Sequence, residues 1–261
     1  DRMAQIVAYH NATPSGPGQR ITADGKTLYA IGTQNNTTWQ DGYAYGIDDV
    51  DWYDVVYKKS TFSQEHNASV SGGNEKFNYY TSLNYLDYNG FMKLNSDTYK
   101  RYNGTAKISA QLASWIRMQY SMRFTRMDFK RPAQLTNGLY SDMARQGWPT
   151  LPLYDRNGYY YASPSPALGL ATGGKDMTQR DIQDHQIAFN IEPIENWITH
   201  VDFNYKIDNR NRHWDSQQTF NHDVAGNPII YNTGSNVHED HRKDNYLNFQ
   251  LYSEYTWSLA E

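Results

Sequence analysis

Hydrophobic and polar residues alternate along much of the chain after residue 62. In 115–126, Ile116, Met118 and Tyr120 fall at every second position, with Arg117 and Gln119 between them. Successive side chains of a β-strand point to opposite faces, so this pattern predicts strands with one apolar and one polar face. Seven runs of this kind are found, at 63–73, 76–88, 102–112, 115–126, 185–191, 197–207 and 245–257.

The connections between these runs alternate in length. Short turns are predicted near Gly73 to Glu75, at Ala113 and Ser114, and across Pro193 to Glu195. Longer segments lie between these hairpins, at 89–97, 128–182 and 210–243. Short turns on one side and long loops on the other are typical of outer-membrane barrels, in which the short turns are periplasmic and the long loops extracellular.

These patterns predict an all-β fold made of antiparallel transmembrane β-barrel strands. We expect residues 63–261 to supply about seven barrel strands, and residues 1–62, rich in Gly, Pro and Asn, to form an irregular extracellular segment. Alternation by itself also suits any antiparallel sheet with one wet face. A soluble or surface-anchored β-sandwich that binds glycans is therefore the alternative.

Three tryptophans mark the short-turn end of the predicted strands. Trp115, Trp197 and Trp257 each lie where a strand meets that side. Tryptophan is enriched at membrane–water interfaces, so we interpret these residues as part of an aromatic belt. Cross-strand pairing of aromatics at hairpin ends is the competing explanation.

The amino-acid composition excludes some classes of protein but does not identify one. The 261 residues include no cysteine, which argues against a disulfide-stapled module, and a net charge of −4 gives no basic field for nucleic acid. Aromatic residues make up 15%, with 23 tyrosines, and the mean hydropathy is −0.85. No apolar run is long enough for a transmembrane helix, but lipid-facing and lumen-facing residues of a barrel average out to low hydropathy.

Aromatic residues of the long 128–182 segment are the candidate substrate-binding residues. Sugars stack on aromatic faces, and exposed loop aromatics commonly serve recognition. The alternative is that they pack the loop against neighbouring protein. The residues concerned are Trp148, Tyr154, Tyr159, Tyr160 and Tyr161.

Catalytic and metal-binding patterns are weak. His238 and His241 are three residues apart, whereas the zinc-binding helix motif needs four. The acidic residues from Asp48 to Asp54 lack EF-hand spacing and suit a solvated, helix-capping loop. There is no nucleophile elbow and no phosphate-binding glycine loop. We therefore predict no enzyme activity, no cofactor and no metal site.

The stretch from His66 to Ile108 resembles the SusC/RagA family of TonB-dependent outer-membrane transporters. The resemblance rests on the turn SGGNEK at 71–76, YLDYNG at 85–90 and KRYN at 100–103. The preceding DWYD at 51–54 and the loop segment from Gln146 to Leu168 also match the family's pattern. The resemblance as a whole covers roughly residues 50 to 261.

The resemblance implies a plugged barrel of roughly 22 strands in the outer membrane of Bacteroidota. It would import oligosaccharides, or sometimes peptides, with a SusD-like surface lipoprotein as lid and TonB as the energy-coupling partner. We find no TonB box, no plug sequence and no final barrel strand ending in an aromatic residue. Since seven strands cannot close such a barrel, we expect the chain to be an internal piece of the transporter.

Overall fold

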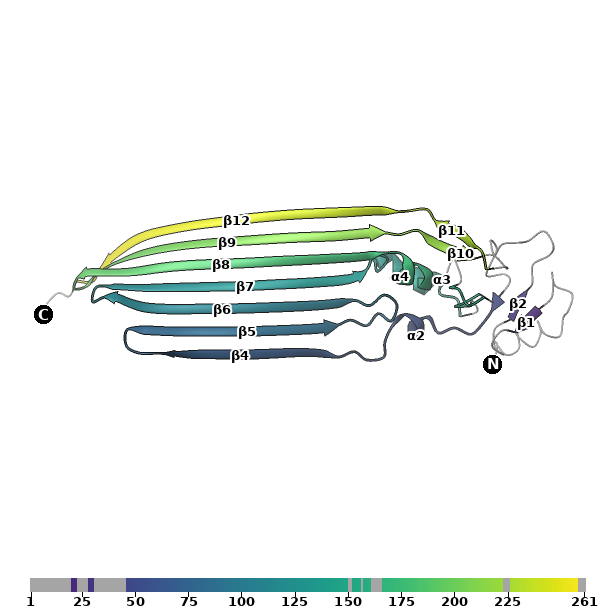
Figure 1. Cartoon of the computed structure of the whole chain (residues 1–261), viewed down its shortest axis with the longest axis horizontal. Coiled ribbons are helices and arrows are strands. Elements are labelled where there is room, and N and C mark those ends of the chain that lie inside the picture. The colour runs from purple at the N-terminus through teal and green to yellow at the C-terminus, as the bar shows by residue number, and fades with distance from the viewer. Residues whose placement is uncertain are drawn as a thin grey trace.

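A single seven-stranded antiparallel sheet dominates the computed structural model (Figure 1). The structure describes residues 20–22, 28–30, 46–149, 152–155, 157–160, 166–222 and 226–257. Its strands follow one another in space in the order in which they follow in sequence, apart from one small inserted hairpin. They are β4 (Ser63–Gly73), β5 (Phe77–Asn89), β6 (Thr98–Ala113), β7 (Ile116–Pro132), β8 (Lys175–Ile194), β9 (Trp197–Ser216) and β12 (Asn236–Tyr255).

The remaining elements gather at the end of the sheet opposite the tight turns (Figure 1). Three short strands form a separate sheet, and two others form a hairpin between β9 and β12. These elements are β1 (Arg20–Thr22), β2 (Leu28–Ala30), β3 (Gly46–Ile47), β10 (Thr219–His222), β11 (Pro228–Asn232), α2 (Trp52–Val56), α3 (Asn137–Gln146) and α4 (Pro166–Thr172). Asp51 caps α2, since its carboxylate accepts the backbone N–H groups of Tyr53 and Asp54, which agrees with the capping role expected of this acidic segment.

All seven predicted runs coincide with strands of the sheet, so the predicted fold class is confirmed. The strands are longer than predicted at the loop end. β7 continues to Pro132 and β8 starts at Lys175, so the connection spans 133–174 and not 128–182. β9 and β12 likewise reduce 210–243 to 217–235. The physical reason is that both faces of these extensions carry polar residues, which removes the period-two signal although the strand pairing continues.

Asparagine and glycine shape the tight turns. Asn74 accepts the backbone N–H groups of Lys76 and Phe77 through its side-chain oxygen, both at 2.9 Å. Gly73 has φ +152°, and a Cβ built there would lie 2.3 Å from the Phe77 carbonyl oxygen, so the turn requires glycine. In the β8–β9 turn, Asn196 adopts φ +69°, a left-handed conformation that asparagine tolerates better than most residues.

The strand register collects the apolar positions of all seven strands on one face. Directly paired residues of an antiparallel sheet share a face. Met118 pairs with Ala110 and with Phe189, and Phe189 pairs in turn with Val201. Val201 pairs with Leu251 at the edge strand. We call this the apolar face, and the opposite side the polar face.

The hydrophobic core lies outside the sheet, among the helices at the loop end. Val56, Met92 and Leu170 are at most 2% exposed and pack with residues of α3. Trp52 and Ala167 form a second small cluster nearby. No described element covers the apolar face of the sheet, so the β-sandwich alternative, which requires a second sheet there, is not supported.

None of the helices in the described part of the chain has both the length and the apolar character that crossing a membrane demands.

Candidate functional site

The apolar face forms a band along the half of the sheet nearest the tight turns. Its side chains are widely exposed: Leu247, Phe249 and Leu251 of β12 are 60–63% exposed, and Leu83 of β5 is 64% exposed. On each strand the band is about as long as the 9–11 residues with which a tilted β-strand crosses a membrane. Apolar patches of this extent are rare on soluble monomers, because each side chain left in water forgoes the free energy of burial.

The predicted interface tryptophans all lie at the tight-turn end of the sheet. Trp115 is in the β6–β7 turn, Trp197 is the first residue of β9, and Trp257 follows the end of β12. Trp197 donates its indole N–H to the Ser253 hydroxyl at 2.5 Å, so its polar edge is satisfied while the residue as a whole remains 44% exposed. This amphipathic placement suits a membrane interface, a role that stays a prediction.

On the polar face, at the same level along the strands as the apolar band, lie neutral side chains that are hydrogen-bonded to one another. Asn84 donates its amide to Asn67 of the neighbouring strand. Asn103 donates to Asn84, and Thr125 donates to Asn103, both at 2.9 Å. Since these four residues pair directly across β4 to β7, they form one row of side-chain hydrogen bonds across the sheet. Such a face is suited to water and polar solutes.

Closer to the loops, the polar face becomes strongly charged and is hollowed into an open cleft of about 600 Å³. By register, every residue that lines this cleft belongs to the polar face. Its lining consists of Tyr99, Met127, Phe129, Arg131, Asp176, Thr178, Arg180, Asp208, Arg210, Arg212, Arg242 and Asp244.

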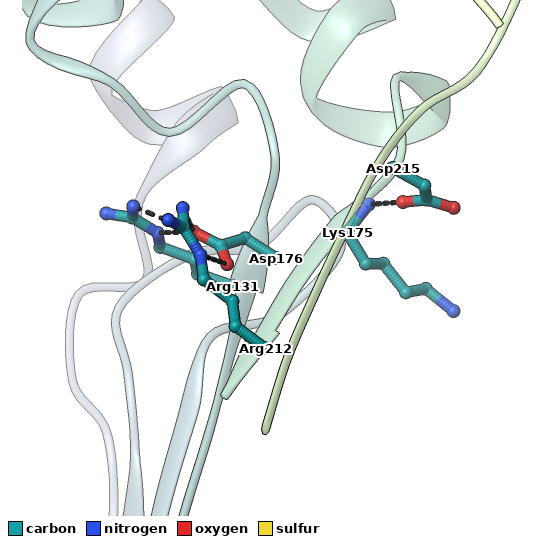
Figure 2. Close-up of polar contacts among 5 residues, drawn as sticks. All are labelled: Arg131, Lys175, Asp176, Arg212 and Asp215. Carbon is teal, nitrogen blue, oxygen red and sulfur yellow. Dashed lines mark hydrogen bonds and ion pairs between the residues drawn. The ribbon is translucent and has the colours of Figure 1, made fainter. Parts of the chain in front are cut away.

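One aspartate at the loop end of the cleft forms ion pairs with two arginines (Figure 2). Asp176 accepts the Nε and terminal nitrogens of Arg131 at 3.0 and 2.9 Å, and those of Arg212 at 2.9 and 3.0 Å. Its side chain is only 4% exposed, whereas both arginine side chains are more than one third exposed. At the same level the backbone N–H of Lys175 donates to the Asp215 carboxylate, which ties β8 to β9.

The predicted substrate-binding tyrosines are placed in two stacked pairs. Tyr154 stacks on Tyr160 with ring centroids 5.1 Å apart, and Tyr159 stacks on His222 of β10 at 3.6 Å. The Trp148 carbonyl accepts the indole N–H of Trp52 at 2.9 Å. Tyr154 and Tyr159 remain 44% and 42% exposed, so their rings retain an accessible face. Tyr161 lies outside the described residues, and substrate binding by this group stays a prediction.

Asp155 organises this tyrosine loop. Its carboxylate accepts the backbone N–H groups of Asn157 at 2.8 Å and Tyr159 at 3.0 Å. The side chain is buried, and burial raises the pKa of Asp155 although these N–H groups oppose the shift. The loop therefore contains a carboxylate whose charged form is disfavoured by burial.

The segment from His238 to His241 lies on β12, not in the loop predicted at 210–243. Because side chains alternate along a strand, His238 and His241 fall on opposite faces of the sheet. His238 contacts the Trp214 ring, and His241 hydrogen-bonds Asn211 at 2.9 Å. Over the described residues, no group of three or more His, Asp or Glu side chains is arranged to hold a metal ion.

Sequence reasoning missed the charged cleft. Arg180, Arg210 and Arg242 all lay within segments predicted as loops, where nothing indicated which residues are neighbours. The signal that could have identified them is the recurrence of charges at every second position, as in Asp208, Arg210 and Arg212. That spacing places all three charges on one face once a strand is assumed.

A sheet of consecutive antiparallel hairpins, with an uncovered apolar band on one face and polar side chains on the other, is a segment of the wall of a transmembrane β-barrel. Its short turns lie at one end and its long connections at the other (Figure 1).

Comparison with known proteins leads to TonB-dependent transporters. The chain is 24% identical over 178 residues to TonB-dependent receptor P26 of Formosa agariphila, a match that covers 64% of this chain and 17% of that protein. Solved structures of the RagAB peptide transporter are similar over 82% of this chain and 24% of theirs, with TM-scores of 0.63, 0.59 and 0.56 and identities of 20%, 17% and 16%. No protein-family model matches the chain.

These matches support the resemblance to the SusC/RagA family, and the chain has the fold of part of the barrel of a SusC/RagA-type TonB-dependent transporter. The chain spans less than a quarter of the length of these relatives.

Proposed function

We propose that this chain forms part of the wall of a TonB-dependent transporter in the bacterial outer membrane. Its apolar face contacts lipid, and its polar face lines the lumen. The observation that carries the proposal is that the register of all seven strands gathers apolar residues on a face that no described element covers. Lipid contact satisfies such a face, while water does not.

The orientation follows from the connections. The tight turns, with Trp115, Trp197 and Trp257, lie on the periplasmic side, and the long connections with α3 and α4 lie outside the cell. The tryptophans then form a belt at the inner interface of the membrane. We place the loops at 90–97, 133–174 and 217–235 on the extracellular side, together with residues 1–62, most of which lie outside the described residues. The sorting of short and long connections to opposite ends of the sheet supports this orientation.

The transported substrate is an oligosaccharide or a peptide, and the partner is a SusD-like surface lipoprotein. The similar RagAB structures are those of a peptide importer, which supports a nutrient-import role. The stacked tyrosines of the extracellular loop offer apolar faces on which sugar rings can lie. TonB acts through a plug domain elsewhere in the transporter. The relatives are named as receptors and transporters, which supports a role other than catalysis.

Cysteine labelling on β12 tests the proposal, because the chain has no cysteine of its own. Single cysteines replace Leu247, Asn248, Phe249, Gln250 and Leu251 in the transporter that carries this segment. In outer membranes, a charged thiol reagent should label positions 248 and 250, and a lipid-soluble maleimide should label 247, 249 and 251. Equal labelling of consecutive positions by the charged reagent contradicts the proposal, as does release of the protein from membranes without detergent.

A further inference from the structure

Three arginines stand side by side on the polar face. Arg180 of β8 pairs directly with Arg210 of β9, and Arg210 pairs directly with Arg242 of β12. We call these three residues the arginine row. Like charges directly opposite each other destabilise a sheet, so the row weakens the wall unless something else offsets the repulsion.

The two outer arginines have acidic partners, and the central one does not. Arg180 donates to Asp208 at 2.8 and 2.5 Å, and Arg242 donates to Asp244 at 2.7 Å. Arg210 is exposed, and its guanidinium group forms no hydrogen bond or ion pair with any residue in the described ranges. Its guanidinium group is therefore available to an anion from outside the sheet.

The surrounding cleft keeps a surplus of positive charge. Its lining contains five arginines and only three aspartates. Asp176 cannot serve Arg210, since both of its oxygens are taken by Arg131 and Arg212. Asp240 lies directly across from Arg212 on β12 and offsets part of the surplus. The cleft as a whole still attracts anions, and the attraction centres on Arg210.

Apolar and aromatic side chains line the cleft beside the arginines. Met127 lies directly opposite Arg180, and Tyr99 and Phe129 pair with each other in the adjacent row. Phe129 is 39% exposed, and the Arg131 guanidinium lies over one face of its ring, 5.8 Å from the centroid, which leaves the other face to a ligand. Aromatic faces next to guanidinium groups suit a ring that is apolar on one side and carries acidic substituents at its edge.

We propose that the arginine row binds acidic oligosaccharides, whose carboxylate or sulfate groups pair with Arg210 and, beside it, with Arg180 and Arg242. Three adjacent strands place these guanidinium groups over two strand spacings, roughly 10 Å. Arginine pairs with carboxylate and sulfate oxygens through two parallel N–H donors. This inference rests on the proposed function, since the polar face must line the lumen for a transported ligand to reach it.

An acidic peptide fits this cleft less well. The backbone groups of β8 and β9 are paired on both sides within the sheet, so a peptide main chain finds no strand edge there to extend. A sugar is recognised by side chains alone. The cleft offers only side-chain donors and ring faces.

The test is calorimetric binding to the purified transporter in detergent. The two acidic sugars are a tetrasaccharide of uronic acids and a tetrasaccharide without carboxylates that carries sulfate esters. The neutral sugar is the uronic acid tetrasaccharide with its carboxylates reduced to alcohols, and the fourth probe is a tetraglutamate peptide. Arg210→Gln should weaken binding of the acidic sugars at least about tenfold and leave the neutral sugar unchanged. Added salt should weaken only the acidic probes. The two acidic sugars show whether carboxylate or sulfate is the preferred group.

Lys107→Gln is the matched control. Lys107 is an exposed cation on the same face, six residues further along the strands and roughly 20 Å from the row, and its removal should change no affinity. Because the Arg210 guanidinium forms no hydrogen bond or ion pair with the described residues, Arg210→Gln should fold normally, and Arg210→Lys should restore part of the affinity.

Three outcomes overturn the inference: equal affinity for acidic and reduced sugars, equal effects of Arg210→Gln and Lys107→Gln, or an effect of Arg210→Gln confined to the peptide. The cysteine labelling of β12 separates these from failure of the proposed function. If labelling alternates as expected while charge has no effect on binding, only the arginine site is wrong.

Discussion

Replacing Leu251 by arginine tests the apolar face most directly. Leu251 is 62% exposed in the middle of the band on β12, with Val201 directly across from it. An arginine near the centre of the bilayer costs about 2–4 kcal/mol on a barrel's lipid face. Loss of the exposed part of the leucine side chain adds about 1–2 kcal/mol, since complete burial of leucine contributes about 1.5–3 kcal/mol. The variant should therefore insert less favourably by about 3–6 kcal/mol, which is more than a hundredfold.

Gln250→Arg is the matched control, one residue away. Gln250 belongs to the polar face and pairs directly with Asp202, so an arginine there gains an acidic neighbour. We expect a change within about 0.5 kcal/mol. Both variants are measured by urea-dependent folding of the transporter into lipid vesicles, with folded protein identified by its heat-modifiable mobility on gels. The assignment of faces is refuted if Gln250→Arg is as damaging as Leu251→Arg.

Three further changes probe the cleft, a turn and the tyrosine loop. Asp176→Ala leaves Arg131 and Arg212 without their shared acceptor and should lower the free energy of unfolding in urea by about 2–3 kcal/mol. Gly73→Ala should cost about 1–3 kcal/mol in the same assay, because its positive φ and the neighbouring carbonyl leave no room for a Cβ. The pKa of Asp155 is raised by burial, so the stability contributed by its protonated form is complete below about pH 4 and is lost as pH rises through the folded-state pKa. Asp155→Asn should remove that dependence, as measured by near-ultraviolet circular dichroism of the loop tyrosines during melting.

Each of these three substitutions is checked against a control variant or a contradicting outcome. Asp244→Ala removes an exposed partner of Arg242 and should cost much less than Asp176→Ala; equal losses would show that the buried aspartate has no special role. Gly104→Ala should be nearly neutral, because a Cβ there would meet only Leu83 at an ordinary 3.7 Å. For Asp155, a variant whose melting keeps the wild-type pH dependence would mean that another group is responsible.

The alternation of the sequence predicted the seven strands because lipid on one side and water on the other impose different residue types at successive positions. Met118 beside Gln119, and Phe249 beside Gln250, show this contrast. Beyond the apolar band, towards the loops, this alternation of apolar and polar residues ends. Asp128 and Lys130 lie on the continuation of the apolar face, and Met127 and Phe129 lie on the polar face. The alternation of β7 therefore reverses its phase there, and the extension of the strand was predicted as loop.

The candidate site was predictable only in part. Tryptophans at the turn end follow from strand boundaries, which hydrophobic periodicity gives to within a few residues. The arginine row does not, because Arg210 is about 30 residues from both Arg180 and Arg242 in the sequence, and only the register of β8, β9 and β12 makes them neighbours. Register is set by turn lengths and by pairing along whole strands, neither of which is visible at a single residue.

The neighbour-only order of the sheet has a consequence for how the wall forms. Apart from the β10–β11 hairpin inserted between β9 and β12, each strand pairs with the strand next to it in sequence, so assembly can proceed hairpin by hairpin without bringing distant segments together. The hairpins are not equal, however. Closing the 42-residue connection 133–174 costs roughly 2–3 kcal/mol more chain entropy than closing a two-residue turn. We therefore expect β8 and β9 to form one early unit and β6 and β7 another, with the β7–β8 seam closing later, once α3 and α4 have packed at the rim.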